Sequence, residues 1–265
     1  MGFRRNIVKT KRIHMRRIIA IATAVLFSVS SALPVFAAGF SADQKAEMGK
    51  IVHDYLMEHP EILRDMANKL DLDDKKREAD ARVGTLKNKA PEIFHDAADA
   101  VVGNPNGDVT MVEFFDYNCS WCKKSIVEMK ALIEKDKNVR VVMKEFPIFG
   151  EGSEYAARAA LASVKQGKYW EFHQALFASE NKVTIDVTDQ IAAEIGLDVA
   201  KMKKDMEDPA IAANIQKTQI LAQTMLITGT PAFIIDDQVF PGYTPLDGLQ
   251  ASLATVRAAG GCKVC

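Results

Sequence analysis

The sequence predicts an α/β protein, because a strand–helix–strand unit is followed by a long helical stretch, a β-hairpin and a last helix. Residues 109–115 are a near-continuous apolar, β-branched and aromatic run that is typical of a buried strand, and residues 139–146 predict another strand. Between them lies an amphipathic helix whose apolar face carries Ile126, Met129 and Ile133. Residues 151–227 are helical almost throughout, which predicts a helical insertion before the chain returns to strand at Thr230.

The first 37 residues have the composition of a secretory signal peptide. Residues 1–17 carry seven Lys or Arg and no acid, an apolar run follows, and small residues lead to a cleavage site after Ala37. An uncleaved anchor is the alternative, but the run is shorter than the ~20 residues that a spanning helix needs. We therefore expect an exported, periplasmic protein, in a compartment where disulfides form and persist.

The charge of the exported chain argues against nucleic acid as a partner. The full sequence has 34 basic and 35 acidic residues, a formal net charge of -1. Loss of the seven basic residues of the signal peptide leaves 27 against 35, a formal net charge of -8. Phosphate contacts need clustered Lys and Arg side chains, which an acidic chain does not favour.

Residues 38–90 are predicted to form a separate helical segment with a charged linker. Residues 42–70 carry apolar residues at helical spacing in two pieces, separated at Pro60, and residues 71–89 are dominated by charges. A piece this small cannot bury its apolar stripe by itself, so it folds back on the main domain or pairs with copies of itself. We expect a homo-oligomer formed through residues 42–70, with the main domain at 91–265.

Cys119 and Cys122 form a C-x-x-C pair where the first strand passes into a helix. At that point the positive end of the helix dipole stabilises a thiolate on the first cysteine, and the second can attack a mixed disulfide. A zinc site, a plain structural disulfide and haem attachment are the alternatives. The other cysteines lie outside zinc-ribbon spacing, and Lys123 stands where haem attachment requires His. The pattern favours thiol–disulfide exchange.

The segment EFFDYNCSWCKK at 113–124, the helical insertion and Gly229-Thr230-Pro231 resemble the DsbA family of thioredoxin-fold disulfide oxidoreductases. The segments VHDYLMEHPEIL and GNPNGDVTMVEFFDYNCSWC resemble more closely its ScsC branch, named for suppression of copper sensitivity. The resemblance implies a thioredoxin fold with an inserted helical domain, preceded by an N-terminal oligomerisation segment. It implies exchange with cysteines of other secreted proteins, a membrane redox partner of the DsbD or DsbB type, and no cofactor.

The resemblance also assigns roles around the cysteine pair. Cys119 would be the nucleophile and Cys122 the resolving thiol of a redox-active disulfide. Pro231 would be a cis-proline beside that disulfide, with Thr230 offering backbone contacts to a bound peptide; the alternative is an ordinary trans proline at a strand start. Trp121, inside the motif, adds apolar contact and no charge, so we expect a weaker oxidant than DsbA. Its alternative role is that of an exposed aromatic that meets substrate chains.

Two charged residues flank the pair in sequence. Glu113 matches a buried acid that can move the proton of the resolving thiol. Lys144, on the next strand, is expected to be its partner, with a solvent-facing or plain structural ion pair as the alternative.

A second C-x-x-C pair, Cys262 and Cys265, follows Gly260-Gly261. This position predicts a flexible tail with a local disulfide or unpaired thiols. The alternative is a tail that binds Cu(I) or exchanges disulfides with Cys119, since thiolates suit soft metals.

Three functions therefore stay open. We expect an exported disulfide isomerase or reductant, because several active sites held together raise the effective concentration for repeated attack on one misfolded chain. A DsbA-like disulfide oxidase and a copper-sequestering protein are the alternatives.

Overall fold

The computed structural model describes residues 40–265, and the predicted signal peptide at 1–37 lies outside them. The chain divides into two compact units between Lys69 and Leu70. Within residues 40–265, no helix combines the length and the apolar character needed to cross a bilayer.

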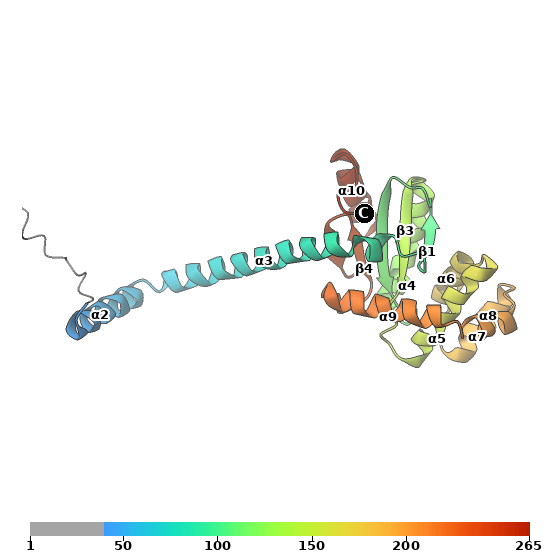
Figure 1. The fold of residues 1–265 in the computed structure, drawn as a ribbon, viewed down its shortest axis with the longest axis horizontal. Coiled ribbons are helices and arrows are strands. Elements are labelled where there is room, and N and C mark those ends of the chain that lie inside the picture. Colours follow the sequence, from blue (N-terminus) through green and yellow to red (C-terminus); the bar gives the residue numbers. More distant parts are fainter. Residues whose placement is uncertain (1–39) are drawn as a thin grey trace, which may run out of the picture. The chain divides into compact units, whose positions relative to one another are not determined.

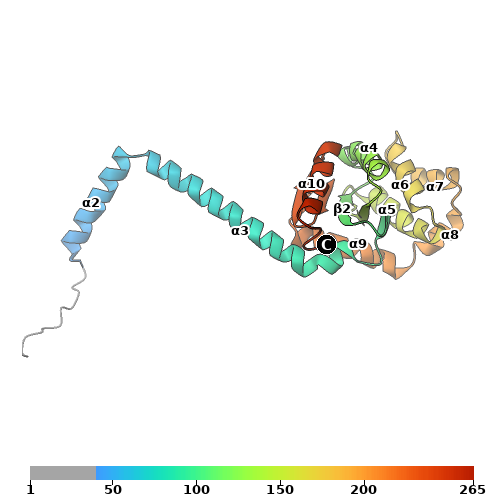
Figure 2. The ribbon, with the colours of Figure 1, turned by 90° about the horizontal axis from the view of Figure 1, so that it is seen from above.

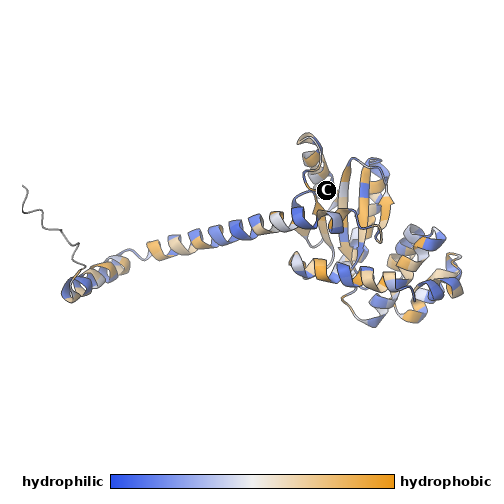
Figure 3. Cartoon of the chain, in the orientation of Figure 1, coloured by the Kyte–Doolittle hydropathy of each residue, from blue (hydrophilic) through white to orange (hydrophobic). Residues whose placement is uncertain are grey.

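The N-terminal unit contains helix α2, Ala42–Glu58, and the start of α3, Glu61–Phe94. A capping box begins α2: the Gln44 N–H donates to Ser41 Oγ (3.2 Å), and the Ser41 N–H donates to Gln44 Oε1 (2.9 Å). The two helices are separated around Pro60, as predicted. No residue of α2 is buried, although apolar and polar residues are mixed along its ribbon (Figure 3). Among the described residues of this unit, the large apolar side chains that are exposed are those of Phe40, Met48, Ile51, Val52, Tyr55, Met57, Leu63 and Met66.

Helix α3 continues past the domain boundary expected after residue 90. It runs without a break to Phe94 and includes Pro91, whose missing N–H costs about 3 kcal/mol in a helix interior. Leu86, Ile93 and Phe94 are fully buried in one apolar cluster with the sheet. Burial contributes about 1.5–3 kcal/mol for each large apolar side chain, which offsets the cost of the proline. The last turns of α3 therefore belong to the main domain.

A five-stranded mixed sheet forms the centre of the main domain (Figure 1). Its strands β2 and β3 are parallel and α4 connects them, which confirms the predicted strand–helix–strand unit. The other neighbours are antiparallel, and the strand order is β1-β3-β2-β4-β5. The bounds are β1 Ala100–Gly103, β2 Val109–Phe115, α4 Ser120–Lys135, β3 Val139–Glu145, β4 Ala232–Ile235 and β5 Gln238–Pro241.

The helical insertion lies between β3 and β4. Helices α5 to α8 gather at one side of the sheet (Figures 1 and 2), and α9 returns from them to contact β3. The terminal helix α10 follows β5 and packs against α4. The bounds are α5 Glu151–Ser163, the 3-10 turn η1 Val164–Gln166, α6 Tyr169–Ala178, α7 Ile185–Glu194, α8 Val199–Asp205, α9 Pro209–Thr224 and α10 Leu246–Ala258.

Each face of the sheet packs against its own helices. Alternation along β2 sends Met111 and Phe115 into the cluster that includes α4 and α10. Val112 and Phe114 point the other way, into the cluster that includes the end of α3 and the end of α9. The sheet therefore separates two cores, and successive residues of a strand contribute their side chains to one core and then the other.

Candidate active site

Cys119 is the N-cap residue of α4, directly after β2. Its backbone is extended (φ -82°, ψ 118°), and its sulfur accepts the N–H of Cys122 at 3.4 Å. This is the hydrogen bond that a Ser or Asp side chain makes at a helix start, made here by sulfur. The helix N-terminus thus directs unpaired N–H groups at Cys119 Sγ, as the sequence position predicts.

This environment lowers the pKa of Cys119 to about 6. The hydrogen bond with the Cys122 side chain is the largest cause, and the Thr230 side chain and the Cys122 and Trp121 N–H groups add to it, while partial burial opposes them. At neutral pH the sulfur is therefore largely a thiolate, the form that attacks disulfides.

Cys122 differs from Cys119 in both burial and titration. Its side chain is almost fully buried one turn into α4. Burial is the first cause that raises its pKa, followed by the hydrogen bond with Cys119 and the charge of Glu113. Both cysteines are free thiols in this structure. The pair thus has one sulfur with a lowered pKa and one buried sulfur with a raised pKa.

The Thr230–Pro231 peptide bond is cis and lies against the reactive sulfur. Cys119 Sγ lies 3.2 Å from the Thr230 carbonyl oxygen, to which the protonated thiol donates. The Pro231 carbonyl in turn accepts the Gly242 N–H (2.9 Å), which fastens this loop to the end of β5. The structure therefore brings together Cys119, Cys122, Thr230 and Pro231.

Glu113 lies on β2, on the sheet face that packs against α4. It is buried, and burial is the main reason that its pKa rises to about 8; the Cys119 charge adds to the rise and the Ser125 hydroxyl opposes it. A carboxyl group poised near neutral pH can accept and return a proton. Glu113 also contributes to the raised pKa of Cys122, so the two groups are electrostatically coupled.

The expectation that Lys144 pairs with Glu113 is wrong. The parallel register sets Glu113 beside Met143 and Lys144 beside Phe114, so the two charged side chains point to opposite faces of the sheet. Lys144 instead forms a buried ion pair with Asp99 and donates to the Glu92 carbonyl at 2.6 Å.

Asp99 is the partner that the sequence analysis missed. Burial raises its pKa, although Lys144 opposes this, and Asn214 donates to it at 2.9 Å. The ion pair connects β3 to the loop just before β1, and the hydrogen bond to the Glu92 carbonyl connects β3 to the end of α3, on the sheet face away from Glu113. A polar residue just before β1 gave no local signal of this contact.

Asp116 and Asn118, which the sequence analysis also missed, hold the loop before Cys119. One carboxylate oxygen of Asp116 accepts the N–H groups of Ile148 (2.7 Å) and Phe149 (3.0 Å). The other accepts the Asn118 N–H (2.7 Å) and the Ser153 hydroxyl (2.7 Å). An Asp followed by Asn two residues later is an Asx-turn pattern, which was a usable signal.

A hollow of about 420 Å³ opens beside Cys119. Asn118 shapes it by bonding both backbone groups of Val183: its Nδ2 donates to the carbonyl (2.9 Å) and its Oδ1 accepts the N–H (2.9 Å). Residues 117–120 and 179–183 line the hollow, together with Lys123, Phe149 and Leu176. A substrate sulfur can approach Cys119 from this side.

Trp121 is 55% exposed beside the pair. Its ring lies 5.8 Å from that of Tyr243, and Lys124 Nζ lies over both rings, at 5.3 and 4.5 Å from their centroids. The geometry agrees with an aromatic surface that a substrate chain can contact.

The second cysteine pair is a disulfide, Cys262–Cys265, in a tail that is anchored and not free. Asp236, at the turn after β4, accepts the N–H groups of Lys263 (2.7 Å) and Val264 (2.9 Å), and Val264 is buried in the core cluster beside α3. The expectation of a flexible tail is therefore wrong. Because Asp236 and Pro231 lie at opposite ends of β4, the tail disulfide is also placed away from Cys119.

The chain matches two family profiles. Residues 110–254 match the DSBA-like thioredoxin domain, and residues 44–77 match the N-terminal domain of the copper resistance protein ScsC. The two matches confirm the resemblance that the sequence motifs indicated.

Solved structures of other proteins share this fold. A thioredoxin-like oxidoreductase from Silicibacter pomeroyi is 44% identical, with a TM-score of 0.63, over 63% of this chain and 97% of its own. ScsC from Proteus mirabilis, in a transitional conformation, is 26% identical, with a TM-score of 0.60, over 82% of this chain and 97% of its own.

Curated relatives match part of this chain. Disulfide bond formation protein D of Bacillus subtilis is 26% identical over 165 residues, 58% of this chain and 74% of that protein. A Na(+)/H(+) antiporter NhaA of Salinispora tropica is 26% identical over 163 residues, 61% of this chain. The chain spans only about a quarter of that antiporter's length.

Proposed function

The chain belongs to the family of DsbA-like thioredoxin domains, whose members are thiol–disulfide oxidoreductases, and from this premise we propose that it exchanges disulfides with cysteines of other secreted proteins. One observation carries the proposal: Cys119 Sγ caps α4, its pKa is lowered to about 6, and it lies 3.2 Å from the Thr230 carbonyl. A structural disulfide or a metal ligand requires no such difference between its two sulfurs.

In the reductive direction, the Cys119 thiolate attacks one sulfur of a substrate disulfide. A mixed disulfide forms, and the other substrate sulfur leaves as a thiolate that takes up a proton. Cys122 then loses its proton to Glu113 and attacks Cys119 Sγ. The product is a Cys119–Cys122 disulfide, and the substrate leaves with both sulfurs reduced.

In isomerisation, a second substrate thiol attacks the mixed disulfide and Cys119 leaves again as a thiolate. No net electrons are transferred, so isomerisation requires only that Cys119 attacks and then leaves. The low pKa of Cys119 makes it a good leaving group. We propose isomerase or reductant as the role of the chain, with the oxidase direction as the alternative. Trp121 adds no positive charge near the thiolate, which supports a weaker oxidant than DsbA. A glutathione redox titration that gives a reduction potential as high as that of DsbA would overturn the expectation of a weaker oxidant.

Self-association through residues 42–70 is part of this proposal. The N-terminal unit exposes apolar side chains on both of its helices, for example Ile51 (61%) and Leu63 (56%), and covering them requires a partner surface. The match to the ScsC N-terminal domain supports the same idea. Copies joined there would present several Cys119 thiolates to one misfolded chain. Export by a signal peptide at 1–37 and a membrane redox partner of the DsbD or DsbB type complete the proposed setting.

The test is refolding of scrambled ribonuclease by the chain from residue 38 and by a chain that begins at Leu70. The truncation stops there because residues 86–94 belong to the core of the main domain. We expect efficient rescue only with the longer chain, and a shift from oligomer to monomer in light scattering. Equal rescue by both chains would contradict the isomerase proposal.

Point variants make the test sharper. Ile51→Glu places a charge on the apolar stripe of α2 and should give monomers, whereas Lys50→Glu, on the opposite side of the same helix, should not. Oligomers that persist in Ile51→Glu would show that this stripe is not the interface.

The copper-sequestering alternative is separated by Cys122→Ser. If the pair exchanges disulfides, this variant accumulates mixed disulfides with secreted proteins, because the second attack is removed. If the pair is only a metal site, the variant binds copper more weakly and traps nothing.

A further inference from the structure

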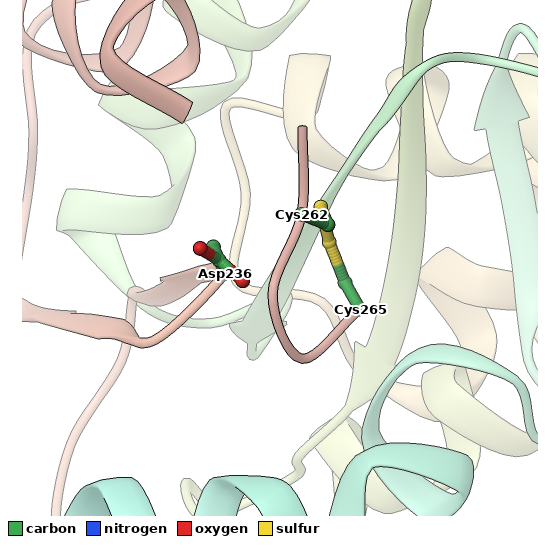
Figure 4. A group of neighbouring side chains, drawn as sticks. All are labelled: Asp236, Cys262 and Cys265. Atoms are coloured by element: carbon green, nitrogen blue, oxygen red, sulfur yellow. A yellow bond between two sulfur atoms is a disulfide. The ribbon is translucent and has the colours of Figure 1, made fainter. Parts of the chain in front are cut away.

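The anchored tail places three metal-ligand atoms together, away from Cys119. Cys262 Sγ, Cys265 Sγ and a carboxylate oxygen of Asp236 all lie within 4.8 Å of one another (Figure 4). Asp236 is buried and the two cysteines are partly buried, so the group is fixed and still reachable from solvent. Among residues 40–265, this is the one group of three or more Cys, His, Asp or Glu side chains with such a spacing.

The chain geometry that assembles this group is specific. Gly260 and Gly261 have φ values of 92° and 103°, a conformation open to glycine, and they turn the chain back after α10. The N–H groups of Lys263 and Val264 both donate to the same oxygen of Asp236, Oδ1. These hydrogen bonds hold the C-x-x-C loop against the carboxylate.

In this structure the two sulfurs are joined to each other, so they cannot ligate a metal. Reduction by a dithiol breaks the S–S bond: two electrons and two protons pass to Cys262 and Cys265, and the dithiol becomes a disulfide. Binding of a divalent metal then releases both thiol protons, because thiolates are the ligands. The site therefore exists only in the reduced tail.

We propose that the reduced tail forms a Zn²⁺ site with Cys262, Cys265 and Asp236 as its three protein ligands. Two thiolates alone would suit Cu(I) equally well, but a carboxylate oxygen is a ligand that zinc accepts and that soft Cu(I) does not favour. Three protein ligands leave the fourth tetrahedral position to water. In the oxidised state the tail is a disulfide-closed loop that is hydrogen-bonded to Asp236, and in the reduced state it is a zinc site.

The test uses the full chain with Cys119→Ser and Cys122→Ser, so that the tail carries the only thiols. After reduction by a phosphine and anaerobic removal of the reductant, the protein is titrated with Co²⁺, a coloured substitute for Zn²⁺. We expect one equivalent to bind with intense thiolate-to-cobalt absorption, and Zn²⁺ to displace it. The oxidised protein should show no such absorption. Absence of this absorption in the reduced protein would overturn the proposal. The comparison of the reduced with the oxidised protein requires no substitution in the tail.

The matched variant is Asp236→Asn in the same background. Asparagine tolerates the positive φ of this position (51°), and its amide oxygen can still accept the N–H groups of Lys263 and Val264. The two hydrogen bonds that hold the tail are therefore kept while the anionic ligand is lost. We expect Zn²⁺ to bind at least roughly tenfold more weakly. An unchanged Zn²⁺ affinity would overturn the three-ligand site. Cu(I) binding that ignores Asp236→Asn, without tight Zn²⁺ binding, would overturn it in favour of a two-thiolate copper site. Circular dichroism confirms that each variant is folded.

Discussion

Two cysteine pairs of identical spacing occur in this chain, and their surroundings give them opposite chemistry. Cys119 and Cys122 are free thiols at the start of α4, whereas Cys262 and Cys265 form a disulfide after the end of α10. Helix N-terminal N–H groups point at the first pair and none at the second. The C-x-x-C spacing lets two sulfurs meet, and the position relative to a helix decides whether one of them becomes a stable thiolate.

Each pair also has a carboxyl group, and the two carboxyl groups differ in the same way. Glu113 is buried beside Cys122 with a pKa raised to about 8. Asp236 accepts two backbone N–H groups and fixes the tail. The first group is suited to moving protons and the second to holding structure.

The largest loss of activity is expected when Cys119 is replaced, and almost none when the tail cysteines are replaced. Cys119→Ser should lower the rate of insulin reduction by several orders of magnitude, because no other thiolate lies at the site. The matched variant Cys262→Ser with Cys265→Ser should keep the rate within about twofold, since the tail is remote from Cys119. A large loss in the tail variant would contradict the separation of the two pairs.

Glu113→Gln should slow the release of a preformed mixed disulfide by roughly 10²-fold, because the base for Cys122 is lost. The parent rate should rise as the pH passes through about 8, where the Glu113 carboxylate forms, and the variant should lack this rise. Quenched-flow measurement of the mixed disulfide checks both. Ser125→Ala serves as the control: it removes a hydroxyl that lowers the pKa of Glu113, so the rise should move to higher pH.

The alkylation of Cys119 should follow the lowered pKa. With a pKa of about 6, the thiolate fraction grows about tenfold between pH 5 and pH 7 and then levels off. In Cys122→Ser, the largest cause of the lowered pKa is replaced, and the midpoint should move up. Rates of iodoacetamide labelling against pH measure this, and a midpoint above pH 8 in the parent protein would remove the basis for a thiolate nucleophile.

The smallest effect is expected in the tail. Val264→Ala should reduce the free energy of unfolding by about 1–2 kcal/mol, because a buried side chain in the cluster beside α3 becomes smaller. Lys263→Ala, whose exposed amine is 3.9 Å from Asp237, should change it by less than ~0.5 kcal/mol. Urea unfolding distinguishes the two, and insulin reduction should stay unchanged in both.

The order of the elements and the position of the reactive cysteine followed from the sequence alone. A buried strand, then C-x-x-C, then an amphipathic face is a local pattern, and helix capping is decided by local backbone geometry. For the same reason, the break near Pro60 and the hairpin after Pro231 could be predicted.

Only the tertiary structure decided which distant residues meet. Glu113 and Lys144 lie on neighbouring strands, but a register set by the whole sheet sends them to opposite faces. Helix α3 passes through Pro91 because Ile93 and Phe94 are buried against strands that come later in the chain. The tail is held by Asp236, 27 residues before Lys263. Hydrogen bonds and burial between remote segments leave no periodic trace in the sequence, so capping and alternation could be predicted while these contacts could not.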